Sequence, residues 1–194
     1  MELKGKIVLI TGAGKGKGRA LAETLAECGA FVAANDISPI NVGQLVEQIT
    51  ASGGKAKAYI EDIAKKVGVQ SLIKNVEDDL GGIDILINHA AVEPHTSLLD
   101  MDEWDWHRTL DVNLTGAFLV MQSAGRIMRA QGHGVILNIV AGAGEGASEA
   151  GAYISSKAGL AALSHQADGE FSPHGIRVYA VENCEEALSI LETK

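Results

Sequence analysis

The sequence predicts an α/β domain with a doubly wound, mostly parallel sheet of about six strands and helices on both faces. Three observations predict it. Short apolar runs alternate along the chain with segments whose apolar residues repeat at helical spacing. A glycine-rich turn, residues 11–18, follows the first run. The 194 residues suit one core, and no linker or repeat divides them, so we expect a single domain over residues 1–194.

Each predicted strand is a short apolar run, and several are rich in β-branched residues. The six runs are residues 7–10, 31–34, 56–60, 83–87, 135–140 and 176–181. They are apolar on both sides of the pleat, which is expected of a parallel sheet that helices cover on both faces.

The segments between the strands have helical periodicity, and some carry capping signals. The first ends at Gly29, and Ser38-Pro39 supplies a cap and a first-turn proline for the second. The helical faces lie at residues 21–28, 42–49 and 69–80, within one long helix at 102–131, and at 152–171, with a short stretch at 187–191.

The charge, the apolar runs and the cysteine count of the chain exclude several classes of function. The formal net charge is −9, and this field repels phosphate backbones, so we expect no nucleic-acid partner. No apolar run approaches membrane-spanning length, and the first residues lack the apolar stretch of a signal peptide. Cys28 and Cys184 do not make a disulfide framework. These features favour a cytoplasmic protein.

The glycine-rich turn between the first strand and first helix suits a phosphate group. Glycines let the backbone approach a pyrophosphate closely, and the helix N-terminus offers N–H groups and a positive dipole end. This arrangement predicts a Rossmann-type dinucleotide site, although a glycine triplet alone can be a simple turn. The candidate cofactor-binding residues here are Gly12, Gly14, Lys15, Gly16, Lys17 and Gly18.

Asp36 ends the second predicted strand, about 20 residues beyond the glycines. A carboxylate there can accept hydrogen bonds from adenosine ribose hydroxyls, and it would repel a 2′-phosphate, which favours NAD over NADP. Lys15 and Lys17 favour the opposite choice because either could pair with a 2′-phosphate. A solvated Asp36 that only caps the next helix is the alternative.

Further motifs follow the later strands, and together with the glycine turn they resemble the short-chain dehydrogenase/reductase family from about Leu3 to Val181. They are Asp62-Ile63, Asn88-His89-Ala90-Ala91, Asn113 within Asp-Val-Asn-Leu, Tyr153-x-x-x-Lys157, and residues 173–178. The resemblance implies a homodimer or higher homo-oligomer, with an interface on the long helix and the helix that carries Tyr153.

The same resemblance assigns roles to individual residues. It implies that Asp62 and Ile63 contact adenine, and that Asn88 and Ala90 belong to the cofactor site. It makes Tyr153, Lys157 and Asn113 the catalytic set, with Asn113 holding a water that relays protons to Lys157. The alternative for Asn113 is a buried amide that simply satisfies backbone groups.

The chemistry of Tyr153 and Lys157 also follows from their spacing. Residues at i and i+4 share one face of a helix, and a nearby ammonium favours the phenolate form of a tyrosine. Lys157 can therefore prepare Tyr153 to exchange a proton with a substrate oxygen while the cofactor exchanges a hydride. A surface pair without a role is the alternative for this common spacing.

The sequence departs from the family after the fifth strand. The family has a serine there, but Val140 and Ala141 carry no hydroxyl. Removal of one such donor typically costs about 10²–10³ in turnover. Ser148 is the only hydroxyl between Asn138 and Tyr153. Other polar residues near the expected mouth, with solvated loop positions as the alternative, are Glu93, His95 and Glu145.

A second departure follows the sixth strand, where the family's Pro-Gly pair, substrate lid and seventh strand do not occur in residues 182–194. We expect a nicotinamide half open to water. Two functions therefore stay open. One is an NAD(P)-dependent oxidoreductase that interconverts a small-molecule alcohol and carbonyl without a metal. Its activity is either full or impaired. The other is a catalytically inactive dinucleotide-binding or protein-interaction module of dehydrogenase ancestry.

Overall fold

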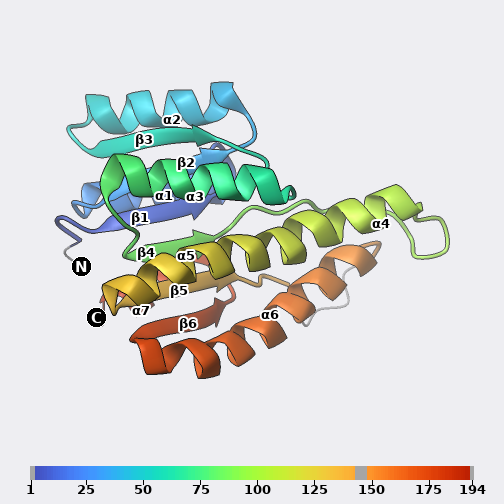
Figure 1. Cartoon of the computed structure of the whole chain (residues 1–194). Coiled ribbons are helices and arrows are strands. Elements are labelled where there is room, and N and C mark those ends of the chain that lie inside the picture. The colour runs from blue at the N-terminus through green and yellow to red at the C-terminus, as the bar shows by residue number, and fades with distance from the viewer. Residues whose placement is uncertain (1–2, 143–147, 193–194) are drawn as a thin grey trace.

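Six parallel strands form one sheet in the order β3-β2-β1-β4-β5-β6 (Figure 1). The computed structural model describes residues 3–142 and 148–192. The strands are β1 (Ile7–Thr11), β2 (Phe31–Asp36), β3 (Lys55–Ile60), β4 (Ile85–Asn88), β5 (Gly134–Ile139) and β6 (Ile176–Val181). The parallel sheet confirms the predicted fold class.

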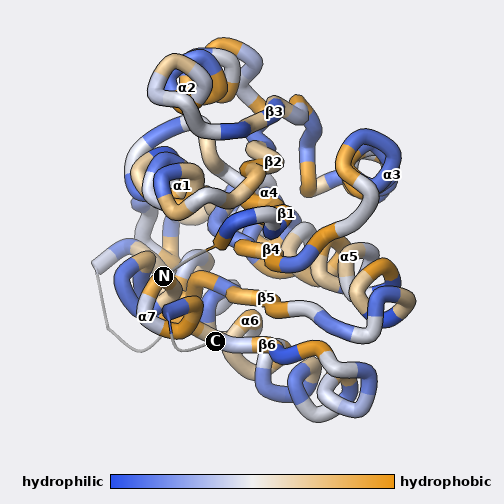
Figure 2. Tube along the Cα trace, turned by 90° about the vertical axis from the view of Figure 1, so that its left-hand side faces the viewer, coloured by the Kyte–Doolittle hydropathy of each residue, from blue (hydrophilic) through white to orange (hydrophobic). Residues whose placement is uncertain are grey.

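Helices cover both faces of the sheet (Figure 2). One layer contains α1 (Gly16–Glu27), α2 (Pro39–Ala51) and α7 (Cys184–Glu192), and the other contains α3 (Lys66–Leu80), α5 (Ala117–Gln131) and α6 (Gly151–Phe171). A helix α4 (Glu103–Leu110) precedes α5, and a 3-10 turn (Ser172–His174) follows α6. In the described part of the chain, no helix is both long and apolar enough to span a bilayer.

The core lies in two apolar clusters, one on each face of the sheet. Successive strand residues point to opposite faces. Val8 and Ile10 of β1 therefore pack with α1 and α2, while Leu9 packs with α3 and α5. All three side chains are completely buried. This burial explains the unbroken apolar runs in the central strands.

The two edge strands differ from the prediction that every strand is apolar on both sides. In β3, Lys55, Lys57 and Ile60 are exposed and only Tyr59 is buried, and β6 exposes Arg177. Each edge strand has a strand partner on one side only, and the helices do not cover it fully, so polar side chains fit there.

The long helix predicted over residues 102–131 is not uniformly α-helical. A π-helical segment, Asp111–Gly116, separates α4 from α5. Such a segment widens the helix by one residue per turn and frequently occurs at functional sites. Asn113 lies within it and is completely buried.

The strand order reverses between β1 and β4, which lie side by side although β2 and β3 separate them in the chain. Thr11 at the end of β1 joins the two strands, because its hydroxyl accepts hydrogen bonds from the backbone N–H groups of His89 and Ala90, both at 3.2 Å. In doubly wound folds, ligands bind at the carboxyl ends of the strands beside this reversal.

Candidate active site

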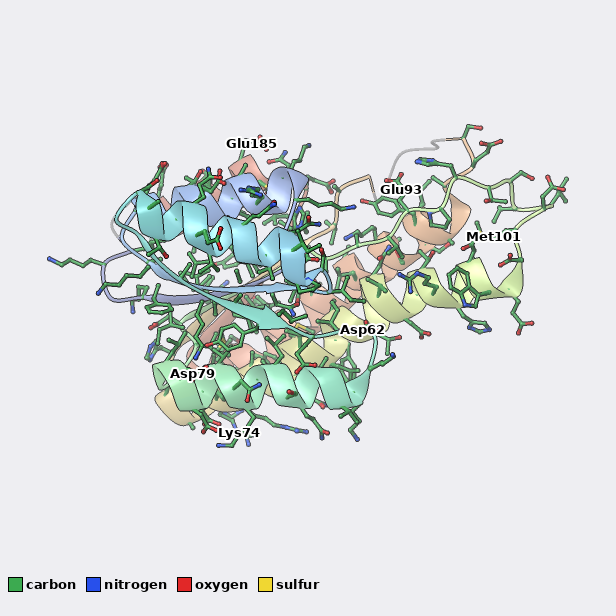
Figure 3. The ribbon with its side chains drawn as sticks, turned by 90° about the horizontal axis from the view of Figure 1, so that it is seen from above. Asp62, Lys74, Asp79, Glu93, Met101 and Glu185 are labelled. Carbon is green, nitrogen blue, oxygen red and sulfur yellow. The ribbon has the colours of Figure 1, made fainter. Side chains whose placement is uncertain are left out.

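A cavity of about 670 Å³ opens at the carboxyl edge of the sheet, beside the reversal of strand order. Figure 3 shows Asp62 and Glu93 at the end of the sheet toward which the strands run. Many of the residues expected to bind a cofactor or act in catalysis line this cavity. They are Gly12, Lys15, Gly16, Lys17, Asp36, Asp62, Ile63, Ala90, Tyr153 and Lys157.

Two glycines of the turn from β1 to α1, Gly12 and Gly18, pack against the segment after β4. Gly12 has a φ of +69°, and a Cβ there would lie 2.7 Å from the Cα of Ala90. At Gly18, a Cβ would lie 2.3 Å from the carbonyl oxygen of Gly12 and 2.7 Å from Nδ1 of His89. Side chains are thus excluded where the turn packs against the segment after β4, and the backbone stays close to the cavity.

The first turn of α1 can hold an anion. The helix begins at Gly16, and Lys15 at its N-cap makes no side-chain cap hydrogen bond. The first N–H groups of a helix have no partner within the helix, and the dipole favours negative charge there. Lys15 and Lys17 add two cationic side chains to the same wall. The residues present therefore fit the diphosphate of a dinucleotide.

Asp36 joins this turn to the end of β2. One carboxylate oxygen accepts a hydrogen bond from the N–H of Gly14 at 2.9 Å, and the other accepts from the N–H of Ser38 at 2.8 Å. A Cβ on Gly14 would lie 2.7 Å from this carboxylate. Asp36 therefore positions the glycine turn, and it also presents negative charge at the cavity wall.

Lys157 is the only lysine whose side chain the described structure buries, at 2% exposure. Its ammonium donates a hydrogen bond to the carbonyl oxygen of Ile139 at 2.7 Å and lies 5.7 Å from the centre of the Tyr153 ring. Burial lowers the pKa of Lys157 to about 8, although the negative charge of Glu93 opposes this shift. Lys157 can therefore exchange a proton near neutral pH.

The pKa of Tyr153 moves in the opposite direction from the one that its spacing to Lys157 predicts. Burial raises it above the ordinary value, and the negative charges of Glu93 and Glu182 raise it further. The prediction considered only the neighbouring ammonium, whereas desolvation disfavours the phenolate. At neutral pH, Tyr153 carries its phenolic proton and can donate it.

Four of the expected site residues lie outside the cavity lining within the described chain: Gly14, Gly18, Asn88 and Asn113. The amide of Asn113 accepts from the N–H of Val92 at 2.8 Å, and it donates to the carbonyl of Val92 and to the Ser156 hydroxyl. These hydrogen bonds hold the segment after β4 against α6. Asn113 therefore stabilises the wall of the cavity without lining it.

Asn88 joins neighbouring strands. Its amide nitrogen donates to the side-chain oxygen of Asn138 on β5 at 2.8 Å, and Asn138 donates to the Ser164 hydroxyl on α6 at 2.8 Å. All three side chains are buried. Asn88 therefore fixes the spacing of β4, β5 and α6 beneath the cavity.

The turn after β5 presents no hydroxyl to the cavity. Val140 is 3% exposed and packs in the core, whereas Ala141 lines the cavity. Ser148 is exposed and is not among the described residues that line the cavity. His95 is also exposed. Glu145 falls outside the described residues.

Several lining residues were not among the candidates from sequence. His89 follows β4, Arg108 comes from α4, and Glu182, Asn183 and Cys184 lie where β6 passes into α7. The position directly after a buried parallel strand could have identified His89 and Glu182, since these positions share one edge of the sheet. Arg108 gave no such signal, because its helix reaches the cavity only through tertiary packing.

Comparisons with known proteins agree with this fold. A family model described as short chain dehydrogenase matches residues 6–184. An uncharacterized oxidoreductase of Thermotoga maritima is 39% identical over 182 residues, which are 93% of this chain and 72% of that protein. A structure of NAD⁺-bound xylitol dehydrogenase has a TM-score of 0.89 at 33% identity, covering 93% of this chain and 70% of that one. A gluconate 5-dehydrogenase from Burkholderia cenocepacia in complex with NADP and tartrate has a TM-score of 0.88 at 32% identity, covering 92% and 71%.

Proposed function

The chain belongs to the short-chain dehydrogenase/reductase family, and on this premise we propose that it is an NAD(P)-dependent oxidoreductase that interconverts an alcohol and a carbonyl. One observation carries the proposal. The glycine turn, Tyr153 and Lys157 come from opposite ends of the chain, and they line one cavity of about 670 Å³. A cofactor site and a proton-transfer pair therefore share one space.

The residues that line the cavity have different roles in the proposed reaction. A bound nicotinamide dinucleotide supplies or accepts the hydride. Tyr153 donates its phenolic proton to the oxygen of a carbonyl substrate, and its raised pKa suits this role at neutral pH. Lys157, with a pKa of about 8, exchanges protons with its surroundings and returns Tyr153 to its protonated form. This assignment favours carbonyl reduction at neutral pH.

We propose NAD as the preferred cofactor, with NADP as the weaker one. The support is Asp36, whose carboxylate stands at the cavity wall and would repel a 2′-phosphate. Lys15 and Lys17 line the same wall and would attract one. Of the similar structures, the xylitol dehydrogenase contains NAD⁺ and the gluconate 5-dehydrogenase contains NADP, so they favour neither cofactor. The preference of this chain then depends on these three side chains.

A second function is supported by the turn after β5. Ala141 lines the cavity without a hydroxyl, and Val140 is buried in the core. A missing hydrogen-bond donor to the substrate oxygen would reduce turnover by about 10²–10³. A dinucleotide-binding module without turnover, or one that binds a partner protein, is therefore the alternative.

Titration with NADH, followed by cofactor fluorescence with NADPH alongside, tests the proposal first. Saturable binding that favours NADH, followed by carbonyl reduction that Tyr153→Phe abolishes, would support the oxidoreductase. Binding with no turnover across a carbonyl screen would support the alternative module. If neither dinucleotide binds, both dinucleotide-dependent functions are refuted.

We also propose that the protein acts in the cytoplasm as a homodimer or higher homo-oligomer on a small-molecule substrate, without nucleic acid or membrane partners. Cys28 and Cys184 are both free thiols, which is typical of a reducing compartment. Phe118 on α5 is 37% exposed, and an apolar ring on that helix suits the expected interface.

A further inference from the structure

His89 occupies a position in the cavity that neither the cofactor assignment nor the proton-transfer pair explains. It follows β4 directly, and Thr11 anchors its backbone N–H. Its ring lies against the start of α1, where Nδ1 would be 2.7 Å, and Cε1 2.9 Å, from a Cβ placed on Gly18. The ring also lines the cavity together with Gly12 and Lys17. His89 therefore stands directly beside the phosphate-binding turn.

The ring of His89 has an unused polar atom. Its Nδ1 is buried and has no hydrogen-bond partner among residues 3–142 and 148–192. Buried polar atoms are nearly always paired, and an exception calls for an explanation. A ligand in the cavity, or a change in the protonation of the ring, would alter the environment of this atom.

The charges that act on His89 come from two helices. Burial lowers its pKa below the ordinary 6.5, and the Lys157 ammonium on α6 lowers it further. An interaction with the backbone of Gly12 opposes this shift, and Lys17 on α1 adds a smaller lowering effect. The imidazole is therefore neutral at pH 7. The anionic groups that line the same cavity are Asp36 at the end of β2, Glu61 and Asp62 after β3, Glu93 in the segment after β4, and Glu182 after β6.

A dinucleotide would reverse this balance. Its diphosphate carries two negative charges, which neutralise the repulsion from the two lysines and attract a proton to a neighbouring imidazole. We propose that His89 is a cofactor-binding residue that takes up a proton when the diphosphate of a nicotinamide dinucleotide enters the cavity. This inference rests on the proposed function, and it adds a pH dependence that the glycine turn alone does not supply.

The sign of the effect follows from linkage. If the bound state holds His89 in its charged form, affinity for the dinucleotide rises as the pH falls toward the pKa of the free protein. The dissociation constant for NADH should then decrease by up to about tenfold per pH unit in this range. Lys157, with a pKa of about 8, is already charged at pH 6.5, so it contributes little to proton uptake there.

Isothermal titration calorimetry with NADH at pH 6.5, in two buffers of different ionisation enthalpy, measures proton uptake directly. For the unmodified protein, we expect uptake of a substantial fraction of a proton per site. His89→Asn keeps a hydrogen-bonding side chain without a titrating group, and it should reduce the uptake nearly to zero while NADH still binds. His89→Gln serves as a second variant if the first does not fold.

His95→Asn is the matched control, because His95 is exposed and lies in the same segment after β4 but outside the cavity lining. It should leave proton uptake unchanged. NADH binding by the unmodified protein without proton uptake, or uptake that persists in His89→Asn, would overturn the role of His89 and leave the proposed function intact. Absence of NADH binding to the folded, unmodified protein would overturn both.

Discussion

Replacement of Lys157 by methionine isolates the free energy of burying its ammonium group. The side chain is 2% exposed, and burial lowers its pKa from 10.5 to about 8. This difference means that the charged lysine destabilises the folded protein by about 3 kcal/mol at pH 7. Methionine has a similar length and carries no charge, so Lys157→Met removes this penalty.

The pH dependence separates this penalty from other effects of the substitution. A cation whose pKa is lowered on folding destabilises the protein below the folded pKa, and the penalty fades as the pH rises toward the unfolded pKa. At pH 9.5, about 1.4 kcal/mol of it remains. The lost hydrogen bond to Ile139 costs about 1–3 kcal/mol at every pH.

Urea unfolding of both proteins at pH 7 and pH 9.5 checks the prediction. Lys157→Met changes the free energy of unfolding relative to the unmodified protein, and this change should be more stabilising at pH 7 than at pH 9.5 by about 2 kcal/mol. Lys66→Met, at an exposed position at the start of α3, is the control and should change stability by about 0.5 kcal/mol or less at either pH. A difference between Lys157→Met and the unmodified protein that is the same at both pH values would refute the reasoning.

Three further predictions concern the cofactor, the substrate oxygen and the assembly. Asp36→Ala should weaken NADH binding more than NADPH binding in fluorescence titrations, and equal losses would remove Asp36 from ribose recognition. Ala141→Ser should increase carbonyl reduction measured by NADH oxidation, because residue 141 lines the cavity, whereas Val140→Ser should mainly destabilise the core. If Ala141→Ser leaves the rate unchanged, the missing hydroxyl does not limit turnover. Light scattering at micromolar concentration should show a dimer or larger oligomer, and a monomer would contradict the proposed interface.

The sheet could be predicted because its central strands are buried on both faces. Continuous apolar runs such as that of β1 leave few alternatives, and the turn residues mark where each run ends. The π-helical segment around Asn113 could not be predicted, because helical periodicity is nearly the same on either side of it. The edge strands were assigned too much burial, since composition does not show which strand lies at an edge.

The candidate site was only partly predictable for a related reason. Motifs placed Tyr153 and Lys157 on one helix face, and the structure places both at the cavity. The direction of the Tyr153 pKa shift depends on burial and on Glu93 and Glu182, which lie in the segments after β4 and β6. Electrostatic effects of this kind require tertiary positions, and sequence spacing supplies only the contacts within one helix.

The hydrogen bonds from Asn88 through Asn138 to Ser164 have a consequence for the orientation of α6. Ser164 lies seven residues, or about 10 Å, beyond Lys157 along the same helix. Because seven residues make nearly two full turns, the two side chains leave the helix in almost the same direction. Rotation of α6 about its axis would break the bond to Asn138. The hydrogen bond from β5 therefore fixes the rotation of α6 about its axis, and with it the direction in which Lys157 and Tyr153 face the cavity.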